Sequence, residues 1–222
     1  MPIFDFPPVD SADEHGLLAL GGDLEIPSLM LAYSQGIFPW PISEEYPLAW
    51  FSPDPRGVIL MDNFKIPQSF KKILKNNPFT VTFNKDFPAV IESCSETKNR
   101  SGVQGTWITQ EIIDAYLKLH QVGHAYSVEA WNQDGELVGG LYGVNIGSFV
   151  SGESMFYRES NASKTVLYFL MHHLQDHKIN WLDTQMVTPV VESFGGSEIS
   201  RPHYLDLLQD QLDQEKPTGL FL

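Results

Sequence analysis

The sequence predicts an α+β protein with a small N-terminal α/β domain, residues 1–58, and a larger C-terminal domain, residues 59–222. Two observations predict this division. The first part is rich in proline, glycine and aromatic residues and contains one clear helix pattern. In the second part, strand and helix patterns follow one another closely, and three successive strand patterns are separated only by tight turns. Antiparallel strands with helices before and after them are typical of an α+β fold.

The helix expected in the N-terminal part spans residues 27–35. Pro27 suits the first turn of a helix, and Gly36 suits the left-handed residue that often follows a helix end. The remainder of this part is expected to be mostly loops that pack on the larger domain.

The next segment is predicted to contain a strand, a helix, a second strand, a second helix and a loop. These elements are expected over residues 57–61, 66–76, 79–83, 87–94 and 95–105, in that order.

The centre of the C-terminal domain is predicted to be a helix followed by three antiparallel strands. Thr109 can cap the helix, and Gly123 can end it. Asp134-Gly135 is a strong hairpin signal between the first two strands. The strands are expected over residues 125–131, 137–144 and 148–156.

Four further elements complete the chain. Asn161 can cap a helix with an i, i+3, i+4, i+7 apolar pattern, and residues 179–185 predict a strand. Thr188-Pro189 opens a short helix, and residues 202–212 form the last one. A three-stranded meander followed by helix, strand and helix resembles the acyl-CoA N-acyltransferase (GNAT) fold of many acetyltransferases.

The loop before the long helix departs from that fold. Its usual pattern, Arg-x-x-Gly-x-Gly/Ala, binds the pyrophosphate of coenzyme A through backbone amides. Here the loop runs from Arg158 to Ser163, Asn161 replaces the first glycine, and Glu159 is expected where the pyrophosphate would lie. We therefore expect a GNAT-like domain that does not bind coenzyme A and needs no cofactor.

Composition indicates where the protein works in the cell and whether it binds a metal. The N-terminus lacks the basic region of a secretory signal, no apolar run is long enough to span a bilayer, and the single Cys94 cannot form an internal disulfide. We expect a cytoplasmic protein without a membrane partner. The seven histidines show no spacing typical of a metal site, so no metal is expected.

The net charge of −14 argues against a nucleic-acid partner, but the charge is unevenly distributed. Residues 63–100 hold seven basic and three acidic residues, whereas the segments on either side are acidic. The lysines on one face of the short helix, or just before it, are Lys65, Lys71, Lys72 and Lys75. From charge alone, a solvated helix face is the simpler interpretation and a nucleic-acid contact is the alternative.

Six short motifs stand out along the chain. They are GLLALGGDL at 16–24, GIFPW at 36–40, SPDPR at 52–56, TWIT at 106–109, GGLYG at 139–143 and GESMF at 152–156. In this order they resemble the signatures of the bacterial leucyl/phenylalanyl-tRNA–protein transferase family. The resemblance covers nearly the whole chain, and six ordered motifs make a chance similarity implausible.

The resemblance implies transfer of Leu or Phe from Leu-tRNA or Phe-tRNA to proteins with N-terminal Arg or Lys, which marks those proteins for degradation. Met is left open as a third donor residue. It also implies a small N-terminal domain and an acyltransferase-like domain that works without coenzyme A. We expect a monomer. Two alternatives remain open: a coenzyme A-dependent N-acetyltransferase, and a non-catalytic protein that binds the 3′ end of tRNA.

By resemblance, Asp183 and Gln185 are the catalytic pair, with Gln185 taking the proton of the acceptor amine and Asp183 polarising it. Residues two apart on a strand point to the same face. Because a neutral carboxamide is a very weak base, the residues favour Gln185 as a hydrogen-bond acceptor that orients the amine. Asp183 would then fix the Gln185 side chain or attract the cationic acceptor. Glu153 is expected to bind the acceptor's α-amino group or basic side chain through a charge-assisted bond.

An apolar pocket for the Leu or Phe side chain is expected between the meander and the following helix. Its expected lining is Leu141, Val150, Leu167, Leu170, Leu174 and Leu182. Ordinary core packing is the simpler interpretation of this stripe, although a pocket floor can also be core.

The remaining expected contacts are with the tRNA. By resemblance, Trp50, Trp107 and Tyr116 form an aromatic platform for the terminal adenosine, on which an unpaired base can stack. The lysines of the basic helix, Lys71, Lys72 and Lys75, with Lys65 before them, would follow the phosphate backbone of the acceptor stem.

Overall fold

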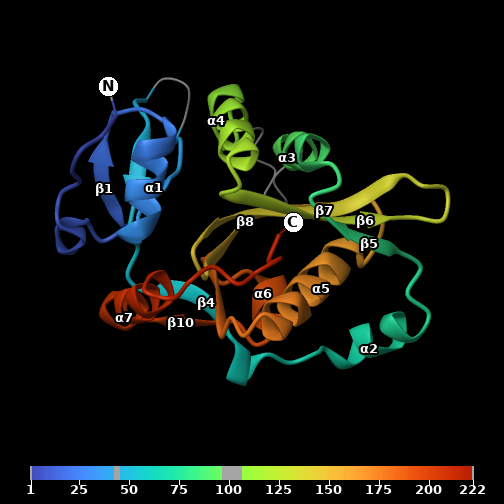
Figure 1. Cartoon of the computed structure of the whole chain (residues 1–222). Helices are drawn as coiled ribbons and strands as arrows, with labels where there is room; N and C mark the ends of the chain where they lie inside the picture. Colours follow the sequence, from blue (N-terminus) through green and yellow to red (C-terminus); the bar gives the residue numbers. More distant parts are fainter. Residues whose placement is uncertain (1, 43–45, 97–106, 222) are drawn as a thin grey trace.

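The computed structural model describes residues 2–42, 46–96 and 107–221. The described residues form two separate β-sheets, and helices pack around the larger one (Figure 1). This mixed composition agrees with the α+β prediction. Most of the predicted loop at 95–105 lies outside the described residues.

A small three-stranded sheet in the N-terminal part is absent from the sequence prediction. Its strands are β1 (Leu17–Leu20), β2 (Phe38–Pro39) and β3 (Ala49–Phe51), in the order β1-β3-β2. The predicted helix, α1 (Ile26–Ser34), contacts this sheet, and a 3-10 turn, η1 (Val9–Ser11), precedes it. Strands of two to four residues are too short to show the alternating pattern by which strands are recognised.

The larger sheet has seven strands in the order β10-β4-β9-β8-β7-β6-β5. Neighbouring strands are antiparallel except β8 and β9, which are parallel. The strands are β4 (Arg56–Leu60), β5 (Thr80–Phe83), β6 (Ala125–Trp131), β7 (Leu137–Ile146), β8 (Phe149–Tyr157), β9 (Trp181–Gln185) and β10 (Ser197–Ile199). Six of them agree with the predicted strands, whereas the three-residue β10 was not predicted.

Helices cover both faces of this sheet (Figure 1). α3 (Phe87–Ser95) and α4 (Gln110–Gln121) pack on one face, and α5 (Ala162–Asp176) packs on the other. The other helical elements are η2 (Met61–Asn63), α2 (Gln68–Lys75), α6 (Pro189–Ser193) and α7 (Arg201–Leu212). None of the helices in the described part of the chain is both long and apolar enough to span a bilayer.

Of the two side-chain caps predicted, at Thr109 and Asn161, only the one at Thr109 forms, and Thr188 provides a further cap. Thr109 accepts a hydrogen bond from the Ile112 amide, and Thr188 accepts one from the Val191 amide. Asn161 precedes α5 as expected, but its side chain makes no capping bond. Its backbone is left-handed, with φ of 72°, a conformation that asparagine tolerates better than most residues. The prediction of a side-chain cap at Asn161 was therefore wrong.

Candidate active site

β8 and β9 meet at one residue pair and then diverge. Ser151 and Asp183 are the bridging partners of the two parallel strands. Beyond them lies a cavity of about 240 Å³ between the two strands, β7, α5 and α6. Its size suits a single amino-acid side chain better than a large cofactor.

The cavity is mainly apolar, with polar groups contributed by β8, β9 and the turn before α6. The apolar lining residues are Trp40, Leu141, Met155, Leu167, Leu182, Met186 and Val191. The polar ones are Glu153, Ser154, Thr184, Gln185 and Thr188. An apolar cavity with a few polar groups is the usual form of a site that binds one apolar side chain in a fixed orientation.

Three of the six predicted pocket residues line this cavity: Leu141, Leu167 and Leu182. The other three, Val150, Leu170 and Leu174, belong instead to the buried cluster between the sheet and α5. Leu170 and Leu174 lie about one and two turns further along α5 than Leu167, beyond the cavity. Sequence periodicity identified the apolar face of α5. It could not show where β8 and β9 separate, and so it could not tell which residues of that face line the cavity.

Trp40, Met155, Met186 and Val191 were not predicted to line the pocket. They come from the N-terminal part, β8, the segment after β9, and α6. The GIFPW and GESMF motifs contain Trp40 and Met155, and these motifs were the only signal for either residue.

Glu153 lies at a β-bulge, an extra residue in one strand of a pair. Gly143 pairs with Gly152, but Tyr142 pairs with Ser154, so Glu153 has no partner on β7. The bulge requires close backbone approach, because a Cβ at Gly143 would lie 1.9 Å from the Ser151 carbonyl oxygen. Bulges often change the direction of a side chain next to an active site.

A second irregularity lies on β9. Gly57 of β4 pairs with Gln185 and Val58 pairs with Asp183, which leaves Thr184 as the extra residue. Gln185 also has a left-handed backbone, with φ of 54°. The simple alternation is therefore broken, and only Gln185 of the predicted pair lines the cavity. The prediction that Asp183 and Gln185 share one face was wrong for this physical reason.

Glu153 and Gln185 meet through their side chains. Gln185 Nε2 donates a hydrogen bond of 3.0 Å to Glu153 Oε1, which also accepts one of 2.7 Å from Ser151 Oγ. With its amide nitrogen turned to Glu153, Gln185 has a carbonyl oxygen that accepts no hydrogen bond from the described residues. That oxygen can accept a hydrogen bond from a substrate, as predicted for an orienting residue.

The Glu153 carboxyl is held in an unusual electrostatic environment. Burial raises its pKa to about 7, and the Asp183 charge adds to this increase. Hydrogen bonds from Ser151 and Tyr33, and the charge of Arg56, act in the opposite direction. A carboxyl with this pKa changes charge near neutral pH, which is the range that suits a general base.

The raised pKa predicts that stability falls as the pH rises. The ordinary pKa of this carboxyl is 4.5, so between 4.5 and about 7 the folded protein binds more protons than the unfolded chain. We expect the contribution of Glu153 to unfolding free energy to drop by on the order of 2–3 kcal/mol across this interval. Urea unfolding of the wild type and Glu153→Gln at about pH 5 and about pH 8 measures it. A stability difference between the two proteins that does not change with pH would rule out this desolvation.

Asp183 is wholly buried in a polar cluster behind the cavity. Its carboxylate accepts hydrogen bonds from Arg56 Nε at 3.0 Å and Arg56 Nη2 at 2.7 Å, and one from the Tyr204 hydroxyl at 3.0 Å. Asp183 Oδ1 also accepts a bond of 2.9 Å from the Gln185 amide. Asp183 thus holds the backbone of Gln185, not its side chain, and its charge is paired with Arg56. The prediction that it attracts the cationic acceptor does not fit this geometry.

Arg56 was missed as part of the site. The side chain is buried, and it also donates to the Gly36 carbonyl at 3.1 Å and lies against the rings of Phe38 and Tyr204. It therefore ties α7, the N-terminal part and β9 together behind the cavity. The SPDPR motif, which ends at Arg56, was the only indication in the sequence.

Two of the three residues predicted to stack on adenosine are core residues. Trp50 is 1 % exposed, and its indole nitrogen donates to the Gly21 carbonyl at 2.8 Å. Tyr116 is fully buried, and its hydroxyl is hydrogen-bonded to that of Tyr33. Neither ring has a face that a base could reach, so both assignments are corrected.

Trp107, the third predicted residue, is partly exposed and stacks on Trp40. The two ring centroids are 5.2 Å apart and the ring planes differ by 24°. Because Trp40 also lines the cavity, this pair forms the aromatic surface next to it.

The basic helix, α2, packs its apolar side on the protein and turns its lysines to solvent, as its sequence predicts. Its buried residue, Phe70, packs against Tyr168 and Phe194. The four lysines, Lys65, Lys71, Lys72 and Lys75, are all exposed. Within residues 2–42, 46–96 and 107–221, no group of three or more His, Cys, Asp or Glu residues could hold a metal ion.

The loop before α5 differs from the prediction. Arg158 donates to the Leu137 carbonyl and to Ser93, both at 3.0 Å. Glu159 accepts a hydrogen bond of 2.9 Å from Asn132 and does not line the space in front of α5. The prediction that the Glu159 carboxylate lies where an anion would bind at this helix was wrong.

Comparison with known proteins identifies close relatives. Residues 58–209 match the family model described as leucyl/phenylalanyl-tRNA protein transferase, and residues 22–54 match the model for its N-terminal domain. Proteins named leucyl/phenylalanyl-tRNA–protein transferase are similar over most of their length. That of Flavobacterium johnsoniae is 48% identical over 206 residues, covering 93% of this chain and 96% of the relative. That of Shewanella halifaxensis is 47% identical over 212 residues, covering 95% and 88%.

One solved structure, that of L-PGS from Bacillus licheniformis, aligns more remotely. The sequence identity is 12%, the TM-score is 0.42, and the alignment covers 72% of this chain and 50% of that one. Similarity at this level supports no conclusion about fold or function.

Proposed function

This chain belongs to the leucyl/phenylalanyl-tRNA–protein transferase family and is an aminoacyltransferase, and we propose that it transfers Leu or Phe from aminoacyl-tRNA to the α-amino group of N-terminal Arg or Lys. We include Met as a third donor residue. The product would carry a new N-terminal residue that acts as a degradation signal. We propose that the protein does this as a cytoplasmic monomer.

One observation carries this proposal beyond family membership. Glu153 and Gln185 meet at a cavity whose remaining lining is largely apolar. The apolar part suits the side chain of Leu or Phe, and the polar pair suits the amine that attacks the ester. The ester bond to tRNA is already activated, so the enzyme has to position the two reactants and remove one proton.

We assign the proton transfer to Glu153. An α-amino group has an ordinary pKa of about 7.7–8.0, close to the value of about 7 for the Glu153 carboxyl. Ionised Glu153 would attract the ammonium group and accept a proton from it. The neutral amine then attacks the ester carbonyl, and the C–N bond forms. As the C–O bond to the ribose breaks, the 3′-oxygen takes up the proton that the amine nitrogen loses when it becomes the amide.

Gln185 serves as a neutral orienting group in this mechanism. Its nitrogen donates to Glu153, so its carbonyl oxygen can accept a hydrogen bond from the remaining amine N–H. This directs the nitrogen lone pair toward the ester. Asp183 supports the pair from behind, because it holds the Gln185 amide and is itself held by Arg56.

The expected tRNA contacts extend away from the cavity on two sides. The Trp40–Trp107 pair would stack on the terminal adenosine, and the exposed lysines of α2 would lie along the backbone. We also infer that the larger domain is GNAT-like, because a parallel strand pair, β8 and β9, separates around the proposed acyl site.

Trp40→Ala is expected to weaken donor binding. Loss of a stacked base contact costs about 1–3 kcal/mol, which corresponds to a rise in KM for Leu-tRNA of roughly 5–150-fold. Steady-state transfer assays with a fixed peptide acceptor measure this change. The matched control is Trp50→Phe, which alters a buried ring without removing an accessible surface. An equal rise in KM for both variants would contradict the assignment of Trp40.

A single assay tests the proposed function. Leu-tRNA is mixed with a peptide that begins with Arg, and mass spectrometry detects the peptide extended by Leu. A coenzyme A-dependent acetyltransferase would instead modify the peptide only with acetyl-CoA. A non-catalytic binding protein would retain Leu-tRNA without forming any extended peptide. A matched peptide beginning with Gly should not be extended.

A further inference from the structure

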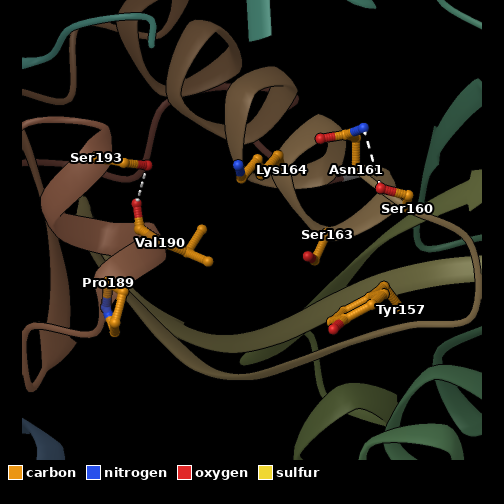
Figure 2. Close-up of a pocket in the computed structure, with 8 residues that line it drawn as sticks. All are labelled: Tyr157, Ser160, Asn161, Ser163, Lys164, Pro189, Val190 and Ser193. Carbon is orange, nitrogen blue, oxygen red and sulfur yellow. Dashed lines mark hydrogen bonds between the residues drawn. The ribbon is translucent and has the colours of Figure 1, made fainter. Parts of the chain in front are cut away.

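A second cavity lies at the N-terminus of α5 (Figure 2). Its volume is about 330 Å³. The end of β8, the first turn of α5, and α6 surround it, and Figure 2 shows their side chains facing a common space. The mechanism above does not use this cavity.

The backbone at the start of α5 is suited to bind an anion. The first amides of any helix have no acceptor within that helix, and the helix dipole places partial positive charge there. Asn161, in the capping position, does not satisfy these amides with its side chain, because its Nδ2 donates to Ser160 Oγ at 3.3 Å and the side chain makes no capping bond. α5 has fifteen residues, so its dipole is fully developed.

Ser163 provides independent evidence for a ligand. It is only 6 % exposed, and its hydroxyl forms no hydrogen bond with any described residue. Figure 2 shows the hydroxyl directed into the space between α5, α6 and the strand below. The hydroxyl opens on the cavity, where a ligand oxygen can take the place of water as its hydrogen-bond partner.

The side-chain charges around the cavity also favour an anion. Lys164 lines it, and none of the described residues that line it is acidic. Two carboxylates neighbour lining residues in sequence. Glu159 is bonded to Asn132, and Glu192, beside Ser193 on α6, does not line the cavity. Hydroxyl groups, helix amides and one lysine together are the usual donors to a phosphate group.

The two cavities are adjacent. Leu167 lines the active-site cavity, and Ser163 lies one helical turn before it. On β8, Met155 lines the first cavity, and Tyr157 lines the second. On α6, Val191 lines the active-site cavity and Val190 lines the second cavity. A ligand in one cavity is therefore within about one helical turn, roughly 6 Å, of the other.

We propose that the cavity at the start of α5 binds a phosphate group, with Ser163 and Lys164 as its side-chain donors. In the transferase reaction this group is a backbone phosphate of the aminoacyl-tRNA strand, an assignment that rests on the proposed function. The phosphate contact lowers the KM for the tRNA donor and leaves the chemical step unchanged.

Two aminoacyl substrates, compared in the same assay, distinguish a phosphate contact from a general effect on the active site. Leu-tRNA carries backbone phosphates, whereas 3′-O-leucyl-adenosine carries none. For Lys164→Gln we expect the KM for Leu-tRNA to rise about tenfold, with kcat within about twofold of the wild type. Ser163→Asp places a carboxylate in the cavity and should raise this KM further. Neither variant should change transfer from leucyl-adenosine.

Lys118→Gln on α4 is the matched control, since it removes the same charge away from this cavity. If Lys164→Gln and Lys118→Gln give the same KM for Leu-tRNA, the inference is wrong. An equal loss with both donors would also overturn it, because the residue would then support the active site itself. Thermal unfolding of each variant confirms that the proteins compared are folded.

Inorganic phosphate distinguishes the source of the ligand and works even without catalysis. We expect it to compete with Leu-tRNA and not with leucyl-adenosine, and to shift the Ser163 amide resonance saturably in the wild type but not in Ser163→Asp. A shift without competition would mean that the site takes free phosphate and not the tRNA strand. No saturable shift would refute the phosphate site. Failure of the wild type to use either donor would refute the proposed function instead, and the phosphate titration would still decide this inference.

Discussion

Replacing Glu153 with Gln is expected to lower transfer to a peptide with N-terminal Arg by about 10²–10⁴-fold, the usual contribution of a general base. The variant keeps the shape of the side chain and can still meet Gln185, but it can neither attract the ammonium group nor accept its proton. The KM for Leu-tRNA should change little, because the proposed donor contacts lie on other residues. Rapid-quench or steady-state assays with both substrates varied separate these effects.

The pH dependence provides a second measurement of the same role. In the wild type, kcat/KM for the peptide should rise as the pH approaches and passes about 7, because the Glu153 carboxyl loses its proton there. In Glu153→Gln this part of the profile should disappear, leaving the ionisation of the acceptor amine. If kcat/KM of the variant still rises near pH 7, another group accepts the proton.

Glu159→Gln is the matched control for charge. Glu159 belongs to the same segment as Glu153, but its carboxylate is bonded to Asn132 outside the cavity. Its replacement should leave transfer unchanged. A comparable loss in both variants would indicate a general electrostatic effect and not proton transfer at Glu153.

Arg56→Met is expected to reduce the free energy of unfolding by about 3–5 kcal/mol. Arg56 and Asp183 are 1 % and 0 % exposed, and the substitution would leave the Asp183 carboxylate buried without its ion-pair partner. Since a typical domain is stable by only about 5–15 kcal/mol, this is a large fraction of the total. Urea unfolding followed by circular dichroism measures the loss.

Two further variants test the cause of that loss. Tyr204→Phe removes the hydrogen bond to Asp183 and the longer one, of 3.3 Å, from Arg56 Nη2, but it leaves the ion pair in place, so it should cost about 1.5–3 kcal/mol. Combining Arg56→Met with Asp183→Leu removes both charges, and part of the lost stability should return, because an apolar pair can replace a buried ion pair at little cost. If the double variant is less stable than Arg56→Met alone, the unpaired charge is not the cause.

Much of the fold could be predicted because its elements are long enough to show a pattern. The predicted helices and six strands of the larger sheet agree with the structure to within a few residues. The elements that were missed, β1, β2, β3 and β10, are two to four residues long. Such strands form because tertiary contacts hold them next to a longer strand, and their own sequence shows no alternation.

The candidate site was predicted less completely, and the reason is local geometry. Glu153 and Gln185 were identified. Asp183 was expected to share their face of the sheet, because residues two apart on a regular strand point to the same side. The bulges at Glu153 and Thr184 break this regular alternation, since an extra residue shifts every following side chain to the other face. For the aromatic residues, sequence similarity pointed to Trp50 and Tyr116, although burial leaves both without an accessible ring face.

The sequence by itself determined the family, the class of reaction, and the elements of the larger domain, because these depend on motifs and on periodicity along the chain. Only the tertiary structure decided which side chains share a space. The divergence of β8 from β9 opened the cavity, and burial next to Asp183 raised the pKa of Glu153. The distant residues Arg56 and Trp40 joined the site only through folding. Desolvation and contact depend on neighbours far away in the chain, so no local pattern could show them.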